Sequence, residues 1–167
     1  ALNEIVALQW PDETGKFPDS ILQVSNINSG TGAHNVIPGE LSLKLNVRYS
    51  PSISSQTVID TVEGILQKYK LNFDSDWEDS GSPFLTTSTT LINSVIESIS
   101  NVTGINEVEQ STEGGTSDGR FIAPTGSEVV EVGPLNASIH KIDEAVSIKE
   151  LEMLPEIYLK VITKLLT

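Results

Sequence analysis

The clearest pattern in the chain is a strict alternation of apolar and polar residues over positions 41–49. Successive side chains of a β-strand point to opposite faces, so this alternation predicts a strand with one dry face. The dry face comprises Leu41, Leu43, Leu45, Val47 and Tyr49, and the polar face comprises Ser42, Lys44, Asn46 and Arg48. Residues 21–27 predict a second strand. The alternation over residues 71–78 predicts a third.

Two helices are predicted around these strands. Residues 2–10 carry apolar side chains at helical spacing without a preceding N-cap, and Ser54 or Ser55 caps a second helix that runs to about Tyr69. The order helix, strand, strand, helix, strand lacks one strand of a ferredoxin-like β-α-β-β-α-β unit. Because that strand would precede Ala1, where the first helix also begins uncapped, we expect an N-terminal truncation.

A hinge-like sequence, Ser-Gly-Ser-Pro at residues 80–83, predicts a boundary between a domain at 1–79 and another at 80–167. The second domain has an α/β pattern. Its predicted elements are a helix around 91–99, a short strand at 108–111, a helical turn at 117–123, a buried strand at 129–132 and a last helix to about Leu166. Ser147 and Glu150 have the spacing of a capping box, and Pro155 predicts a kink or break near Leu154.

The composition argues against several classes of partner. A net charge of −13 with only 10 basic residues disfavours nucleic acid and anionic membrane surfaces. No apolar run approaches the roughly 20 residues that span a bilayer, and no basic region precedes an apolar one as in a secretory signal. The absence of cysteine excludes thiolate ligands and fits a reducing compartment, so we expect a cytoplasmic protein.

Glycines and polar residues that are able to form a site concentrate between Thr112 and His140. The turn Gly-Gly-Thr-Ser-Asp-Gly at 114–119 could hold a carboxylate on its backbone amides and on the hydroxyls of Thr116 and Ser117. It could equally be a tight turn before a helix. No Gly-Lys-Ser/Thr follows it as in a phosphate-binding loop, and no nucleophile elbow surrounds Ser117.

His140 could ligate a metal, act in acid-base catalysis, or simply be a hydrogen-bonded loop histidine. A zinc site needs three or four ligands. The other candidates are His34, which lies in the other predicted domain, and the carboxylates of Glu113, Asp118, Asp143 and Glu144. None of these stands at a recognisable ligand spacing, so by residues alone the metal site is incomplete.

Two further residues have both a structural and a functional interpretation. Arg48, on the polar face of the alternating strand, is either a solvated surface residue or a fork that grips a substrate carboxylate. Asn35, in a glycine-rich loop, either stabilises its turn or donates its amide to a developing oxyanion.

Five segments together resemble a known enzyme family. They are GTGAHNVIPGE at 30–40, NVRY at 46–49, SGSPFLT at 80–86, GGTSDGRFIA at 114–123 and GPLNASIHK at 133–141. In this order they resemble the succinyl-diaminopimelate desuccinylases, which belong to the di-zinc aminoacylase/carboxypeptidase superfamily. The resemblance covers essentially the whole chain, and its specificity comes from the five segments jointly.

The resemblance implies a fold of class α+β or α/β. Residues 1–79 would be a ferredoxin-like lid, or dimerisation, unit that lacks its first strand. Residues 80–167 would be the C-terminal part of a di-zinc peptidase-type α/β catalytic domain. Family members are longer, and their first half carries a His-x-Asp metal motif, a bridging aspartate and a Glu-Glu pair with the general base. None of these motifs occurs here, so we expect the chain alone to be inactive.

The resemblance also assigns roles to individual residues. His140 matches the last zinc ligand, and Asn35 matches a lid asparagine that reaches the partner subunit's active site near the scissile carbonyl. Substrate-contacting positions are matched by Arg48, Ser80, Gly115, Thr116 and Asn136. His34 stands where relatives often carry a second asparagine.

The implied activity is hydrolysis of N-succinyl-LL-2,6-diaminopimelate to succinate and LL-diaminopimelate, in lysine and diaminopimelate biosynthesis. It would require two zinc ions, or cobalt, in a homodimer formed through the lid. Two alternatives remain open. One is a non-enzymatic dimerisation module with an exposed strand edge, and the other is a related deacylase similar to acetylornithine deacetylase.

Overall fold

A computed structural model describes residues 1–113, 115–135 and 137–167 of the chain. It contains two compact units, Ala1–Phe84 and Leu85–Thr167, which are described separately below. The assignment of residues 1–79 to a lid and of residues 80–167 to a catalytic domain stays a prediction. What the structure shows is an α+β chain whose first unit holds a small antiparallel sheet.

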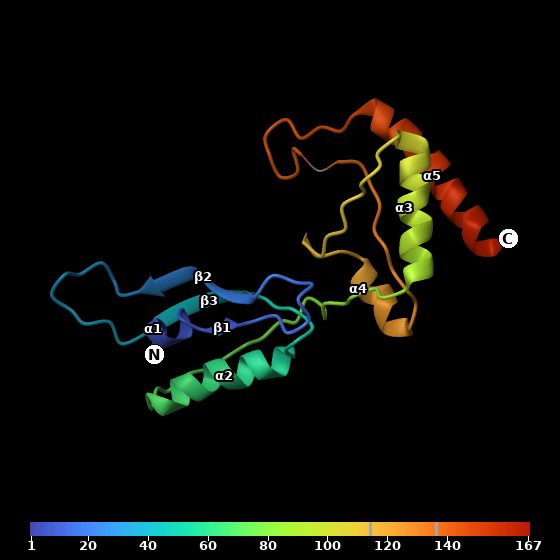
Figure 1. Ribbon diagram of the computed structural model, residues 1–167. Coiled ribbons are helices and arrows are strands. Elements are labelled where there is room, and N and C mark those ends of the chain that lie inside the picture. Colours follow the sequence, from blue (N-terminus) through green and yellow to red (C-terminus); the bar gives the residue numbers. More distant parts are fainter. Residues whose placement is uncertain (114, 136) are drawn as a thin grey trace. The chain divides into compact units, whose positions relative to one another are not determined.

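The first unit is built on a three-stranded antiparallel sheet in the order β1-β2-β3 (Figure 1). The strands are β1 (Gln9–Trp10), β2 (Ser20–Ser29) and β3 (Leu41–Arg48), and two helices accompany them, α1 (Leu2–Ile5) and α2 (Ser55–Lys68). The predicted strands at 21–27 and 41–49 are therefore confirmed. The predicted capping of α2 is confirmed too, because the Ser54 hydroxyl accepts a hydrogen bond from the Thr57 amide at 3.0 Å.

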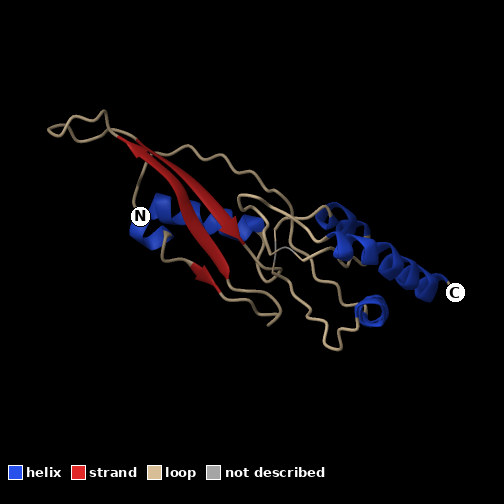
Figure 2. Ribbon diagram, turned by 90° about the horizontal axis from the view of Figure 1, so that it is seen from above, coloured by secondary structure: helices blue, strands red, loops and turns tan. Residues whose placement is uncertain are grey.

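The core of this unit lies between one face of the sheet and α2. Seen from above in Figure 2, the helix crosses behind the strands. Ile5, Leu22, Val62 and Ile65 form its buried cluster, and the partly buried side chains of Leu45, Val47, Trp10 and Trp77 pack against it. Each such apolar side chain contributes roughly 1.5–3 kcal/mol when fully buried. Because side chains alternate along β3, Leu45 and Val47 face the helix, whereas Arg48 lies on the exposed face.

A bulge at Ser25 interrupts the pairing of β2 with β3. Val24 pairs with Leu45 and Asn26 pairs with Lys44, so Ser25 is the extra residue. Its hydroxyl donates to the Lys44 carbonyl at 3.2 Å. Beyond the bulge the hairpin extends past the core, and apolar side chains such as Ile27 are more than half exposed.

The prediction of a helix over residues 2–10 was wrong in its length. The helix α1 ends at Ile5, and the Leu8 amide closes a turn on the Ile5 carbonyl at 3.1 Å. Gln9 and Trp10 then form β1, which pairs with Ile21 and Ser20. The backbone of this segment gains partners at the edge of β2, and this pairing overrides a helical spacing of apolar residues.

The prediction of a third strand at residues 71–78 was also wrong, since no residue of that segment is in a strand. The segment is held against α2 by side chains instead. The Glu63 carboxylate accepts hydrogen bonds from the Ser75 hydroxyl at 2.6 Å and from the Trp77 indole at 3.0 Å. The alternation thus reflects an extended chain with one side on a helix. The ferredoxin-like arrangement stays a prediction.

The second unit consists of helices and extended segments. Its elements are α3 (Thr89–Thr103), α4 (Gly119–Ile122), the 3₁₀ turn η1 (Ala123–Thr125) and α5 (Ile148–Leu166). The helices α3 and α5 pack side by side (Figure 1) and are joined by an ion pair between Lys164 and Glu97. Ser88 caps α3, and Gly104, at φ 77°, ends it in the left-handed conformation. The helices predicted in this unit are confirmed.

The strands predicted at 108–111 and 129–132 are not formed. Residues 129–132 are an extended, partly buried segment that side chains hold in place. The Thr86 hydroxyl accepts from the Val129 amide at 3.2 Å and also contacts the Val129 carbonyl, while the Tyr158 hydroxyl donates to the Val132 carbonyl at 2.6 Å. An apolar run predicts burial, but a strand also requires a neighbouring strand, and none pairs with this segment among the residues described.

The predicted capping box at the start of α5 was wrong in its contacts. Ser147 occupies the N-cap position, but its side chain makes no capping hydrogen bond. The Glu150 carboxylate instead accepts from the Leu135 amide at 3.1 Å. The helix continues through Pro155, so the predicted break near Leu154 does not occur.

Candidate substrate-binding and metal-binding residues

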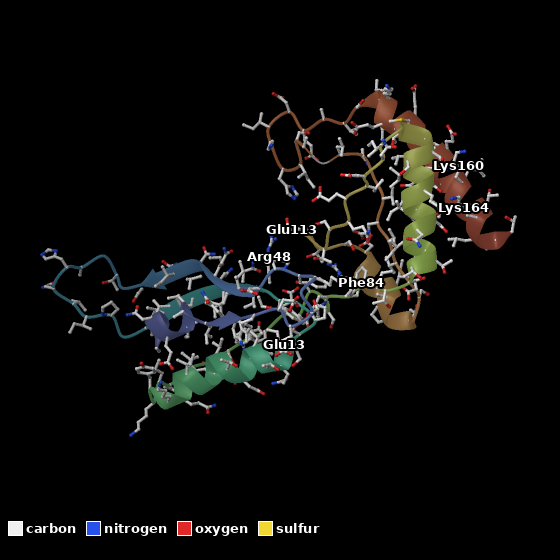
Figure 3. All side chains as sticks on the ribbon, viewed as in Figure 1. Glu13, Arg48, Phe84, Glu113, Lys160 and Lys164 are labelled. Carbon is white, nitrogen blue, oxygen red and sulfur yellow. The ribbon has the colours of Figure 1, made fainter. Side chains whose placement is uncertain are left out.

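Arg48 is the last residue of β3 and lies on the exposed face of the sheet, opposite α2 (Figure 3). Its partner across the sheet is Ile21. Within the part of the chain that the structure describes, the Arg48 guanidinium forms no salt bridge. The side chain is exposed, and a guanidinium is able to donate two parallel hydrogen bonds to one carboxylate.

Ser80 belongs to the same unit and is exposed in a turn that follows the extended segment. The preceding residue, Asp79, accepts a hydrogen bond from the Gly81 amide at 2.9 Å and another from the Tyr49 hydroxyl at 3.3 Å. Tyr49 is the neighbour of Arg48. The structure therefore connects the strand end that carries Arg48 to the turn that carries Ser80.

Asn35 lies in the exposed loop between β2 and β3, at the opposite end of β3 from Arg48. The base of this loop is closed by the Ser29 hydroxyl, which donates to the Glu40 carbonyl at 2.8 Å. A strand of this length spans about 25 Å, so the structure does not bring Asn35 and Arg48 of one chain together. His34, beside Asn35, is exposed in the same loop.

In the second unit, Gly115 and Thr116 are exposed just before α4. The Ser117 hydroxyl accepts from the Gly119 amide at 3.2 Å, so it is engaged within the turn, whereas the Thr116 side chain faces solvent. Because α4 is only four residues long, its N-terminus has little dipole to offer a ligand. Thr116 is thus the better placed of the two hydroxyls for a substrate contact.

Arg120 is a residue that the sequence analysis did not single out. Its guanidinium carbon lies 4.6 Å from the centre of the Phe121 ring, and its Nε atom is buried without a hydrogen-bond partner among the described residues. A buried donor without a partner is costly. In the sequence, Arg120 could have been noticed because it directly follows the glycine turn that ends at Gly119 and is one of few basic residues in the chain.

His140 is exposed and adopts a left-handed backbone conformation, with φ 60°. Its amide donates to the Glu144 carboxylate at 3.4 Å. The surrounding loop is closed by Ser138, whose hydroxyl accepts from the Ala145 amide at 2.9 Å and donates to the Ala145 carbonyl at 2.7 Å. Positive φ is uncommon outside glycine and is frequent at functional positions. The predicted substrate contact at Asn136 lies outside the described residues.

Residues on either side of His140 line an open hollow. It is lined by Pro134, Leu135, Ser138, Ile139, Glu144, Ala145 and Val146. Glu144 therefore both lines this hollow and accepts from the His140 amide.

Over residues 1–113, 115–135 and 137–167, no three His, Asp or Glu side chains gather as a metal-binding group. The exposed imidazole of His140 fits the role of one nitrogen ligand, and zinc takes three or four. The described residues therefore do not gather a complete zinc site, and the role of His140 as a ligand stays a prediction.

None of the helices within the described residues has the length and apolar character needed to cross a membrane.

Comparison with known proteins gives one consistent result. The model of a protein family described as "Peptidase family M20/M25/M40" matches residues 5–164. The chain is 49% identical over 166 residues to the succinyl-diaminopimelate desuccinylase of Pseudoalteromonas atlantica and 47% identical over 167 residues to that of Nitrosococcus oceani. The protein of the same name from Thioalkalivibrio sulfidiphilus is 48% identical over 166 residues.

These alignments cover 99–100% of the chain but only 44% of each of the three relatives. The chain thus spans less than half of the length of the curated relatives it matches.

Proposed function

Because the chain belongs to the peptidase family M20/M25/M40, we propose that it forms the substrate-binding part of a desuccinylase. The reaction is hydrolysis of N-succinyl-LL-2,6-diaminopimelate to succinate and LL-diaminopimelate, in lysine and diaminopimelate biosynthesis in the cytoplasm. The observation that carries this proposal is 47–49% identity, over essentially the whole chain, to three proteins with this name.

The residues of this chain act mainly on substrate binding. Arg48 forms a bidentate pair with a carboxylate of the substrate, which suits its exposed guanidinium at the end of β3. Ser80, Gly115, Thr116 and Asn136 contribute the remaining polar contacts. A substrate with several carboxylates suits such a set of donors, because one exposed arginine binds an anion locally even in a chain whose net charge is −13.

His140 supplies one nitrogen ligand to a zinc centre, for which cobalt can substitute. When bound, zinc polarises a carbonyl oxygen and lowers the pKa of water to near neutrality. The Ser138–Ala145 hydrogen bonds close the loop that carries His140, and the His140 backbone there is left-handed.

Asn35 acts on the active site of the partner subunit in a homodimer. Its place at the far end of β3 from Arg48 supports this assignment, because the two side chains cannot reach one substrate in the same chain. The Asn35 amide donates to the oxygen that becomes negative during amide hydrolysis.

The 167-residue chain by itself is inactive, because it supplies one metal ligand and lacks the motif that carries the general base. Succinate release is measured for the isolated chain and for a protein of full family length, each with zinc. We expect turnover only in the longer protein. Succinate release from the isolated chain above the level of its His140→Ala variant would contradict this expectation.

A second candidate function is a non-enzymatic dimerisation module. The exposed apolar side chains of the β2–β3 hairpin favour it, since Ile27, Val36, Ile37 and Leu41 are 55%, 58%, 93% and 54% exposed. A dimer that persists in a protein of full family length without any amide hydrolysis would support the module. Preferred turnover of N-acetylornithine would instead indicate a related deacylase.

A further inference from the structure

Asp79 joins two segments of the first unit that are 30 residues apart in sequence. Its carboxylate accepts from the Tyr49 hydroxyl at 3.4 Å (Oδ1) and 3.3 Å (Oδ2), and its Oδ1 accepts from the Gly81 amide at 2.9 Å. Tyr49 directly follows Arg48, and Ser80 stands between Asp79 and Gly81. The Asp79 carboxylate therefore accepts hydrogen bonds from the residue that follows Ser80 and from the residue that follows β3.

The turn itself has little regular structure to fix it. Residues 71–88 contain neither helix nor strand, so the backbone of Ser80 is not held in a ladder of hydrogen bonds. Gly81 has φ 138°, a conformation that side-chain-bearing residues rarely adopt. The hydrogen bonds that Asp79 accepts therefore contribute to fixing the backbone that carries the Ser80 hydroxyl.

The charge states of the pair suit a strong hydrogen bond. The Gly81 amide, together with the hydroxyls of Ser55 and Tyr49, holds the pKa of Asp79 below its ordinary value. Partial burial and the negative charge of Asp79 raise the pKa of the Tyr49 hydroxyl. At neutral pH a protonated phenol thus donates to an ionised carboxylate, which gives a charge-assisted bond.

We propose that Tyr49 and Asp79 are positioning residues, which hold the Ser80 hydroxyl at a fixed place relative to the Arg48 guanidinium. This inference rests on the proposed function, in which Arg48 and Ser80 contact the same substrate. Two donors held at a fixed separation discriminate among substrates by the spacing of their acceptors. The pair thereby sets affinity for an acceptor pattern, while the chemical step depends on other groups.

The test uses the zinc-loaded protein of full family length and N-succinyl-LL-diaminopimelate. We expect Tyr49→Phe, which removes a single oxygen, and Asp79→Asn each to raise KM by about fivefold to tenfold. The value of kcat changes by less than about twofold, because the lost contact serves binding in the ground state and the transition state alike.

A double-mutant cycle separates positioning from stability. In a Ser80→Ala background, Tyr49→Phe has nothing left to position, so we expect its effect on KM to disappear. Glu63→Gln is the matched control: it weakens the bonds that hold Ser75 and Trp77 of the preceding segment. It lowers the thermal midpoint and leaves KM unchanged.

Each outcome decides the matter. Equal KM effects of Tyr49→Phe with and without Ser80, or a KM increase in Glu63→Gln as large as in Tyr49→Phe, would overturn the positioning role alone. Unchanged KM in both Tyr49→Phe and Asp79→Asn would do the same. Absence of turnover by the wild-type protein would overturn the proposed function and the inference with it. If Asp79→Asn fails to fold, the Tyr49→Phe cycle still gives the answer.

Discussion

The Asp12 carboxylate accepts a hydrogen bond from the Ser52 hydroxyl at 2.9 Å, although the two residues are 40 positions apart. The same carboxylate accepts from the Thr14 hydroxyl at 2.5 Å and from the Phe17 amide at 3.1 Å. The loop between β1 and β2 is thereby fastened to the turn that follows β3. Because that turn begins two residues after Arg48, this network also fixes the strand end that carries the arginine.

Replacing Asp12 with Asn should destabilise the first unit in a pH-dependent way. Burial raises the pKa of Asp12, but the hydrogen bonds from Thr14, Phe17 and Ser52 outweigh it and hold the pKa far below its usual 3.8. A lowered folded-state pKa gives stability that is present above the unfolded-state value and is lost as the pH falls toward the folded-state value.

Urea unfolding at pH 7 and at pH 3 checks this prediction. The midpoint of Asp12→Asn should be below that of the wild type at pH 7, and the gap should narrow at pH 3. Asp74→Asn, an exposed aspartate of the same unit, is the control and should show no gap at either pH. A gap for Asp12→Asn that is constant with pH would contradict the role of its charge.

The core of the first unit can be tested with two adjacent residues. Ile5 is 1% exposed and belongs to the buried cluster, whereas Val6 is 50% exposed. Ile5→Ala should lower the free energy of unfolding by about 2–3 kcal/mol through lost burial and a residual cavity. Val6→Ala should change it by less than about 0.5 kcal/mol. Similar losses for both, in urea unfolding, would argue against the packing of α1 on α2.

Replacing Arg120 with Met should stabilise the isolated chain. The substitution removes a buried donor that has no partner in the described structure, at the loss of the Phe121 ring contact. An unsatisfied buried donor costs about 1–3 kcal/mol and a cation–π contact gives about 0.5–1 kcal/mol, so the net gain should be about 1 kcal/mol.

Arg48→Met is the matched control for Arg120→Met, because the Arg48 side chain is exposed. Its effect on the unfolding midpoint should be small. A clear loss of stability in Arg120→Met would mean that the guanidinium has a partner in solution.

The role of Asn35 across subunits can be tested by mixing two inactive variants of a protein of full family length. The Asn35→Ala subunit keeps His140, and the His140→Ala subunit keeps Asn35. If Asn35 serves the partner's site, an equal mixture should recover about a quarter of wild-type activity, because half of the dimers are hybrid with one intact site each. A mixture that stays inactive although the subunits exchange would place Asn35 in its own subunit's site. An Asn35→Ala variant that is active by itself would place Asn35 outside catalysis.

Whether a segment's structure could be predicted from the sequence depended on what that segment packs against or pairs with. The alternation at 41–49 predicted β3 correctly because one face of that strand packs on α2 and the other is solvated. The same alternation at 71–78 predicted a strand wrongly, because its extended backbone lies on a helix through Glu63. Period-2 alternation thus reports which side of an extended chain is covered, and it does not report the presence of a neighbouring strand.

The residues of the candidate site likewise could not be assigned from residue type alone. The residue types at Arg48 and His140 allowed both structural and functional interpretations, and only the order of the five segments favoured one of them. The Tyr49–Asp79 contact could not be predicted, because it joins an exposed turn to a strand end 30 residues away. Arg120 could not be selected either, since the cost of its buried Nε is visible only in three dimensions.

The most direct test of the proposed function is succinate release from N-succinyl-LL-diaminopimelate by the zinc-loaded protein of full family length, compared with its His140→Ala and Arg48→Met variants. We predict turnover by the wild type. His140→Ala should lose at least about a hundredfold in kcat/KM, because metal binding is impaired, and Arg48→Met should be affected mainly in KM. A wild-type protein that binds zinc and releases no succinate, or a His140→Ala variant with full activity, would contradict it.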